Sequence, residues 1–339
     1  MLKDITVSFA PHISKPLSTR RVMMDVAIGL VPAIAAAGLY FRIHALLLIG
    51  VCVAWCAATE WVCNAIRRKP NTLGDFSAVV TGIILALSLP PNLPLWTAAA
   101  GSAVSIVVGK MVFGGLGANV FNPAMVGRAF LTASFGVLMT TWTVPATIST
   151  DMPTIAPDSP NVVDTRTQAT PLAWSKTAIK QQAEARTFGS RQFLSTLTGE
   201  VGGSLGETST IAILLGGIYL LWRRTIGFHI PLAVLSSALV FGGIAYLINP
   251  DTYVQPFFHL SSGALLFGAL FIATDPVTAP LTRRGMWLFG IGVGAITMVI
   301  RVLGEYPEGM MFAVLLMNAV TPLIDRLFKR IPAGGKPNA

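Results

Sequence analysis

The chain has 339 residues and a net charge of +9, yet only 12% of its residues are charged, whereas 53% are hydrophobic. A soluble globular protein carries about 25% charged residues, so this chain lacks the polar side chains to cover a water-facing surface of its own size. The composition therefore excludes secreted, disordered and nucleic-acid-binding proteins. It indicates a bundle of membrane helices.

Ten apolar runs predict an all-α polytopic membrane protein. Several runs are shorter than the roughly 20 residues that a straight span needs, and the third and eighth end at Pro90 and Pro276. We expect those two runs to form broken or half-spanning helices. The runs cover 22–40, 45–65, 76–89, 95–113, 122–140, 208–222, 228–247, 260–273, 286–303 and 309–324.

If the N-terminus lies inside the cell, basic residues are distributed unevenly between the inside and outside segments. The segments that fall inside hold 16 Lys and Arg residues, Lys110 among them, whereas the short outside loops hold only Arg42 and Arg301. This bias predicts cytoplasmic termini and an outside loop 141–207, which is periplasmic in a Gram-negative host. The first 20 residues contain no apolar signal segment, so the first span is expected to direct insertion.

The two halves share a pattern that predicts an internal repeat. Residues 82–95 align with 268–281 at a constant offset of 186, and Pro90 and Pro94 match Pro276 and Pro280. Five spans per half would make the repeat inverted, with interrupted helices near the midplane. The interrupted segments are expected at 88–95, 119–124, 274–281 and 304–309. The predicted domains are a cytoplasmic N-terminal segment 1–21, repeats 22–140 and 208–325, the outside loop 141–207 and a cytoplasmic tail 326–339.

Ionisable residues at membrane depth are costly and mark functional candidates. Asp275 stands between Thr274 and Pro276 at a broken helix end, where it would serve ion coupling or, alternatively, cap a helix. Asp25 and Glu60 lie near the inside ends of their spans and are expected to be hydrated. Arg301 would pair with Glu305, four residues later on a helix.

The outside loop contains the segment Asp164-Thr-Arg-Thr167-Gln-Ala169-Thr170-Pro171. Read without comparison, Thr170 caps a helix that has Pro171 at its first position. An Asp followed three residues later by Ser or Thr, and then by x-Ala-Thr, also resembles the recognition motif of a periplasmic flavin transferase. That enzyme joins FMN through its phosphate to the threonine hydroxyl. The motif usually has Gly where this chain has Gln168.

From about residue 15 to 326 the chain resembles the family that unites the D subunits of Rnf ion-translocating oxidoreductases with the B subunits of sodium-pumping NADH:quinone reductases. The chain's length is closer to that of the Rnf proteins. The matching stretches are 121–127 (FNPAMVG), 206–209 (GETS), 273–280 (ATDPVTAP) and 307–312 (PEGMMF), together with 316–318 and 322–325.

The resemblance implies covalent FMN at Thr170, with Asp164, Thr167 and Ala169 as its attachment motif, and a noncovalent riboflavin near Asn122 and Pro123. Electrons would pass between these flavins across the membrane and drive Na⁺ or H⁺ movement. The implied partners are the Rnf subunits A, B, C, E and G, the flavin transferase and the lipid bilayer, without nucleic acid. The sequence offers no metal-ligand cluster and no nucleophile triad.

Two other classes remain open at the level of the sequence. A urea- or ammonium-type channel would also suit two inverted five-helix repeats, and a scaffold subunit would need no cofactor. A denaturing gel viewed under ultraviolet light separates the three, because only a covalent flavoprotein gives a fluorescent band.

Overall fold

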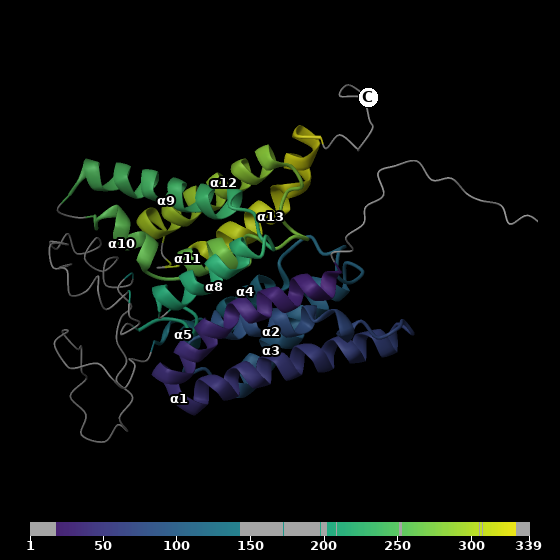
Figure 1. Cartoon of the computed structure of the whole chain (residues 1–339). Helices are drawn as coiled ribbons and strands as arrows, with labels where there is room; N and C mark the ends of the chain where they lie inside the picture. The colour runs from purple at the N-terminus through teal and green to yellow at the C-terminus, as the bar shows by residue number, and fades with distance from the viewer. Residues whose placement is uncertain are drawn as a thin grey trace, which may run out of the picture.

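The computed structural model describes residues 18–142, 172, 197, 202–207, 209–250, 253–304, 306 and 308–329. Over these residues it is helical and has no strand. The helices run roughly alongside one another, with those of the first half on one side of the bundle and those of the second half on the other (Figure 1). Each apolar run contains helix, which confirms the all-α membrane class. Four of the described helices, α1, α9, α12 and α13, are long and apolar enough to cross a membrane.

Helix α1 (Thr19–Ile66) contains the first two apolar runs. Ser18 caps its N-terminus by accepting from the backbone N–H of Arg21. At Arg42 the backbone leaves helical geometry, with φ 57° and ψ −147°. The chain reverses there and the second leg runs back beside the first (Figure 1). The runs 22–40 and 45–65 are therefore separated at Arg42, as expected, although α1 contains both.

The rest of the first half consists of shorter helices. Non-helical backbone separates them at 88–94 and 112–122, so two of the expected interruptions are present. The fifth run is also interrupted, at Phe135, which the sequence did not predict. The elements are η1 (Leu73–Asp75), α2 (Ser77–Leu87), α3 (Leu95–Ile106), the π-helix η2 (Val107–Met111), α4 (Pro123–Ser134) and α5 (Gly136–Thr140).

The second half has longer helices on either side of one fragmented span. The eighth run begins earlier than expected and breaks at Ser262–Gly263, where Gly263 has φ +70°. The expected interruption around Pro276 is also present. The elements are α8 (Thr210–Trp222), α9 (His229–Ile248), α10 (Pro256–Ser261), α11 (Leu265–Phe267), the π-helix η3 (Gly268–Ile272), α12 (Arg283–Leu303) and α13 (Met310–Leu327).

The two halves meet through α1 against α8 and through α4 against α13. At the first of these contacts Gly29 faces Gly216, and a Cβ on Gly216 would overlap the Gly29 carbonyl oxygen. Small residues of this kind let membrane helices approach closely. Large apolar side chains elsewhere face outward, among them Leu39, Val137, Trp222 and Leu247. These side chains suit contact with lipid.

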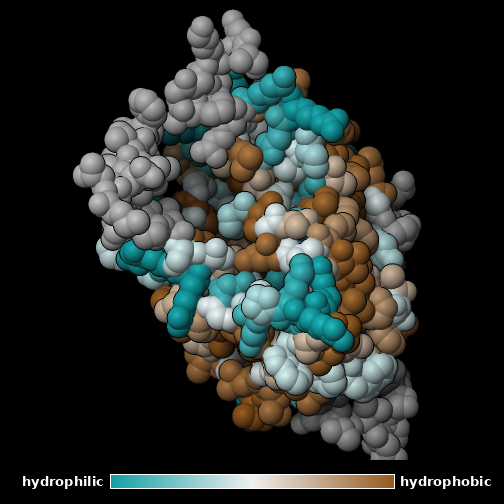
Figure 2. Space-filling view, turned by 90° about the vertical axis from the view of Figure 1, so that its right-hand side faces the viewer, coloured by the Kyte–Doolittle hydropathy of each residue, from teal (hydrophilic) through white to brown (hydrophobic). Residues whose placement is uncertain are grey.

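Exposed basic residues flank several helix ends, including Arg67 and Arg68 after α1, Arg223 and Arg224 after α8, and Arg283 and Arg284 at the start of α12. Figure 2 looks along the bundle and shows hydrophilic residues gathered on the facing end, with hydrophobic residues at its margins. This arrangement suits a bundle whose ends meet water and whose sides meet lipid.

Candidate functional site

A cavity lies where the two halves meet, among α1, α2, η2, α8 and η3. Its volume is about 60 Å³. We call it the Asn122 cavity. Asn122, Pro123 and Asp275, which the sequence singled out from opposite halves, all line it. Its other polar lining residues are Ser77, Thr81, Lys110, Asn119, Thr225 and Thr274.

Asn122 is held in place by its role at the start of α4. Its side-chain oxygen accepts from the backbone N–H of Met125 at 3.3 Å, and Pro123 follows at the first helical position. This is the preferred chemistry for a helix start. The Asn122 amide nitrogen remains free to donate, and it reaches the Asp275 carboxylate at 3.5 Å. Asn122 thus links the interrupted segment before α4 to the interrupted segment that contains Asp275.

Asp275 occupies the turn after η3. Its carboxylate accepts from the backbone N–H of Val277 at 3.1 Å and from the hydroxyl of Thr278 at 3.2 Å. These bonds fit the capping interpretation of Asp275, because a short side chain bonds the backbone two residues on. The carboxylate nevertheless lines the cavity and has no cationic partner among the described residues.

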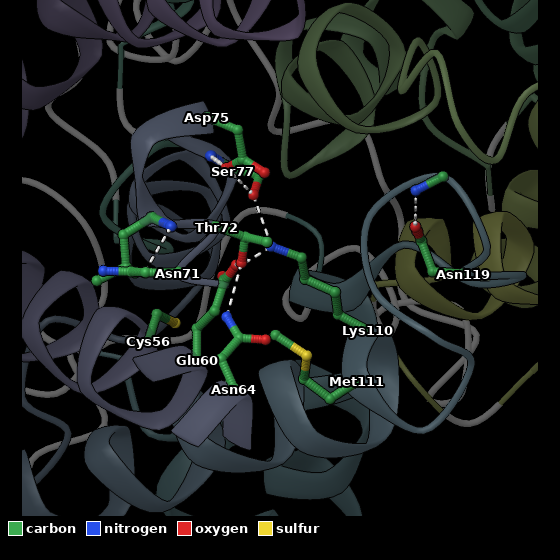
Figure 3. Close-up of polar contacts among 12 residues, drawn as sticks. Cys56, Glu60, Asn64, Asn71, Thr72, Asp75, Ser77, Lys110, Met111 and Asn119 are labelled. Atoms are coloured by element: carbon green, nitrogen blue, oxygen red, sulfur yellow. Dashed lines mark hydrogen bonds and ion pairs between the residues drawn. The ribbon is translucent and has the colours of Figure 1, made fainter. Parts of the chain in front are cut away.

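A buried ion pair lies beside the cavity. Lys110 of η2 donates to Glu60 of α1 at 2.7 Å and to the Ser77 hydroxyl at 2.6 Å. Thr72 donates to the other Glu60 oxygen, and Asn64 donates to Thr72 at 2.8 Å (Figure 3). We call these five residues the Lys110 cluster. Every charged oxygen and nitrogen in it has a bonded partner, which is what a buried ion pair requires.

The Lys110 cluster corrects two expectations. Glu60 was expected to be hydrated and Lys110 to lie in an inside loop, but their exposed fractions are 0% and 1%. Asp25, also expected to be hydrated, is buried and accepts from Arg223 at 3.2 Å and from Thr225 at 3.1 Å. Hydropathy along the chain only shows that these residues lie near span ends. It does not show that partners from distant helices bury them.

A second buried set of charges, the Arg301 cluster, consists of Arg128, Glu207, Arg301 and Glu308. Arg128 lies 3.6 Å from Glu207 and 4.0 Å from Glu308, and Arg301 lies 3.5 Å from Glu308. Arg301 also donates to the carbonyls of His259 at 2.7 Å and Ser262 at 3.0 Å. Its expected partner Glu305 lies outside the described residues.

Several buried atoms of the Arg301 cluster and its surroundings lack a hydrogen-bond partner among the described residues. Such groups are rare in native proteins. They are Arg301 Nε, Glu308 Oε2, Glu207 Oε1, Ser262 Oγ, His259 Nδ1 and Ser204 Oγ.

Glu207 reaches this cluster because the segment 202–207 bonds to the end of α2. Gly206 donates its N–H to the Leu87 carbonyl at 2.7 Å, and Leu205 donates to Leu89 at 3.1 Å. A Cβ on Gly206 would come within 2.8 Å of the Leu87 side chain, so this close approach needs glycine. The sequence placed 207 at the edge of an outside loop and missed Glu207 as a site residue. The stretch 206–209 that supported the family resemblance was the available signal.

The attachment motif itself, Asp164, Thr167, Ala169 and Thr170, lies outside the described residues. Leu172, two positions beyond Thr170, is described and buried. It packs with Val254 and Phe258. A Cβ on Gly263 would come within 2.5 Å of Leu172 Cδ1 and within 2.9 Å of Arg301. Leu172 therefore lies next to the Arg301 cluster.

The chain is similar to known proteins over nearly its whole length. Residues 6–334 match the NQR2, RnfD, RnfE family. The chain is 41% identical to the D subunit of a Na⁺-translocating ferredoxin:NAD⁺ oxidoreductase complex of Acetobacterium woodii, over 96% of this chain and 94% of that protein. It is 39% identical to the D subunit of a proton-translocating complex of that type from Clostridium ljungdahlii, over 97% and 96%. It is 42% identical to the D subunit of an ion-translocating oxidoreductase complex of Stutzerimonas stutzeri, over 94% of each chain. The chain therefore belongs to the NQR2, RnfD, RnfE family.

Proposed function

We propose that this chain is the D subunit of an ion-translocating ferredoxin:NAD⁺ oxidoreductase, that it carries FMN covalently on Thr170, and that electrons cross the membrane through it between two flavins. The observation that carries the proposal is the combination of full-length similarity to such subunits with the motif Asp164-x-x-Thr167-x-Ala169-Thr170. The relatives include one named for Na⁺ and one named for protons. The coupling ion of this chain is thus one of these two.

The Asn122 cavity is the proposed place for a noncovalent riboflavin. Its lining combines apolar side chains with amide and hydroxyl groups and the Lys110 ammonium, a mixture that suits a flat ring system with a polar edge. The volume of about 60 Å³ is smaller than such a ring, so the ring would extend beyond the cavity. A bound flavin would accept and release electrons. Asn122, Asn119 and Lys110 would orient its polar edge.

We further propose that the fold comprises two inverted five-helix repeats. Corresponding helices meet across the halves, since the first spans pack as α1 against α8 and the fifth as α4 against α13. The distribution of basic residues supports cytoplasmic termini and an outside position for loop 141–207. On this topology the Asn122 cavity opens toward the inside, and a flavin at Thr170 lies on the other side.

Asp275 is proposed to couple ion movement to electron transfer. An electron that crosses the membrane alone leaves an uncompensated charge, and a carboxylate near the path can hold the compensating Na⁺ or proton. The support is the position of Asp275 in the cavity lining without a cationic partner among the described residues. Rnf subunits A, B, C, E and G and a flavin transferase are the proposed protein partners.

The experiment that tests this proposal replaces Thr170, the proposed acceptor of FMN. Thr170→Val removes a single hydroxyl from the outside loop, so the protein should accumulate normally but give no fluorescent band on a denaturing gel. Its intact mass should fall by one FMN residue. Thr165→Val is the matched control, because it removes a neighbouring hydroxyl outside the motif residues and should keep the label. A fluorescent band that persists in the Thr170 variant would show that another residue is the acceptor, and a dark wild-type band would exclude covalent flavin altogether.

A further inference from the structure

Helices α1 and α8 form a seam between the two halves, and one side of this seam faces outward. The helices approach most closely at Gly29 and Gly216, and their inner sides line the Asn122 cavity. On the side away from the cavity both helices carry large apolar side chains that are exposed. These are Met24 and Ile28 on α1 and Leu215 and Trp222 on α8.

Three exposed arginines gather at one end of this seam. Arg223 donates to the Asp25 carboxylate at 3.2 Å, which brings the end of α8 to the first turns of α1. Arg21 lies one helical turn before Asp25, and Arg224 follows Arg223. We call Arg21, Arg223 and Arg224 the seam arginines. Among the described residues their one acidic partner is Asp25, so this end of the seam keeps two positive charges.

The apolar side and the seam arginines adjoin each other directly. Trp222 immediately precedes Arg223, and Leu215 lies on the same side of α8 seven residues earlier, about 10 Å along the helix. Tryptophan is enriched where a membrane meets water, and arginine binds phosphate groups through paired hydrogen bonds. An acidic soluble protein would match the arginines but would leave the apolar strip uncovered. A molecule with an anionic phosphate head and apolar chains matches both.

We propose that the seam arginines bind the phosphate of an anionic phospholipid whose acyl chains lie along the outward side of the α1–α8 seam. Asp25 holds Arg223 in place, and the guanidinium groups of Arg21 and Arg224 donate to the phosphate oxygens. Basic residues between membrane helices recognise anionic headgroups in this way. Asp25 also accepts from Thr225, which lines the Asn122 cavity. The lipid therefore bridges the two halves beside that cavity, and this inference does not depend on a bound flavin.

The test uses Trp222 as the reporter, because bromine atoms on a lipid quench a tryptophan that they contact. The full-length chain in neutral detergent is titrated with brominated phosphatidylglycerol or brominated phosphatidylcholine. The difference between the wild type and Trp222→Phe isolates the signal of Trp222. Each unpaired arginine near an anionic headgroup contributes a factor of about five in affinity. Half-quenching should therefore need roughly 25-fold less phosphatidylglycerol than phosphatidylcholine, and added salt should reduce this preference.

Two variants test the seam arginines without disturbing the bond between Asp25 and Arg223. Arg224 has φ 57°, a conformation that favours glycine at a helix end, so Arg224→Gly should fold with no loss of thermal stability. Arg224→Gly and Arg21→Gln should each raise the phosphatidylglycerol needed about fivefold and leave the phosphatidylcholine curve unchanged. Arg68→Gly is the matched control, because Arg68 has φ 50° after the second leg of α1. It should leave quenching of Trp222 unchanged.

Four results would overturn the proposal. Equal quenching by the two lipids in the wild type would mean that the seam does not select an anionic headgroup. An equal loss in the Arg68 control would assign the preference to general surface charge. Displacement of the lipid by inorganic phosphate, at the ionic strength of a chloride control, would show a site for a free anion. Loss of copurifying subunits from the seam variants, with an unchanged lipid preference, would show a protein contact instead.

Discussion

In the Lys110 cluster the ammonium reaches Glu60 at 2.7 Å and Ser77 at 2.6 Å, whereas in the Arg301 cluster the shortest Arg–Glu separation is 3.5 Å. Both sets of charges are buried and draw their members from distant parts of the chain. The first is closed, since neighbours bond to each charged atom. The second leaves buried atoms without partners in the described part of the chain. The two clusters therefore differ in the completeness of hydrogen bonding among the described residues and not in burial.

The largest loss of stability is expected from removing one partner of the ion pair in the Lys110 cluster. Glu60→Ala leaves the Lys110 ammonium buried without its anion, and removing one partner of a buried pair costs about 3–5 kcal/mol. Thermal unfolding in detergent should show this loss. The double variant Glu60→Leu, Lys110→Met should recover much of it, because no charge then remains buried. A single variant as stable as the wild type would mean that the pair is not closed.

Asp275 is an intermediate case, because among the described residues its carboxylate bonds to neutral groups alone. Asp275→Asn keeps the shape and most of these bonds, so stability should change little. If the charge couples ion movement to electron transfer, electron flow between the flavins should fall roughly tenfold, a barrier change of about 1.4 kcal/mol. The FMN should stay attached. Wild-type rates of electron transfer and ion uptake in vesicles would leave Asp275 as a cap only.

A smaller loss of stability is expected from the open cluster. Arg128→Gln removes a cation that stands 3.6 and 4.0 Å from its carboxylates. Glu207, whose pKa is raised to about 7 by burial and the charge of Glu308, can then become protonated instead of remaining as a buried anion. We expect a loss of about 1 kcal/mol, measured as for Glu60. A loss as large as that of Glu60→Ala would remove the contrast between the clusters.

The smallest effect concerns the residue that departs from the usual attachment motif. Gln168→Gly restores that motif without touching either cluster. It should therefore leave labelling of Thr170 unchanged, as read by the intensity of the fluorescent band against total protein. A clearly stronger band would mean that Gln168 limits attachment.

The helices could be predicted from the sequence because apolar runs and prolines act locally. The reversal at Arg42 and the breaks near Pro90 and Pro276 were visible as gaps between runs. The break at Gly263 was not predicted, because the need for glycine there comes from the close approach of Leu172 and Glu308, which lie elsewhere in the chain.

The candidate site was only partly predictable. Asn122, Pro123 and Asp275 stood out because polar or helix-breaking residues interrupt apolar sequence, and they do share a cavity. Lys110 and Glu207 did not, since each lies at the edge of a run where a charge is ordinarily hydrated. Their burial depends on partners 50 and more positions away, such as Glu60. Periodicity along the chain does not contain that information.

Helix α2 connects the Lys110 cluster with the Arg301 cluster. Its first residue, Ser77, bonds to Lys110 at the Asn122 cavity, and the carbonyl of its last residue, Leu87, accepts from Gly206 next to Glu207. Its 11 residues span about 16 Å at the rise of an α-helix. Because both ends are bonded, α2 fixes the spacing between the two buried sets of charges. The length of this short helix is therefore under a constraint that a lipid-facing helix of the same protein does not share.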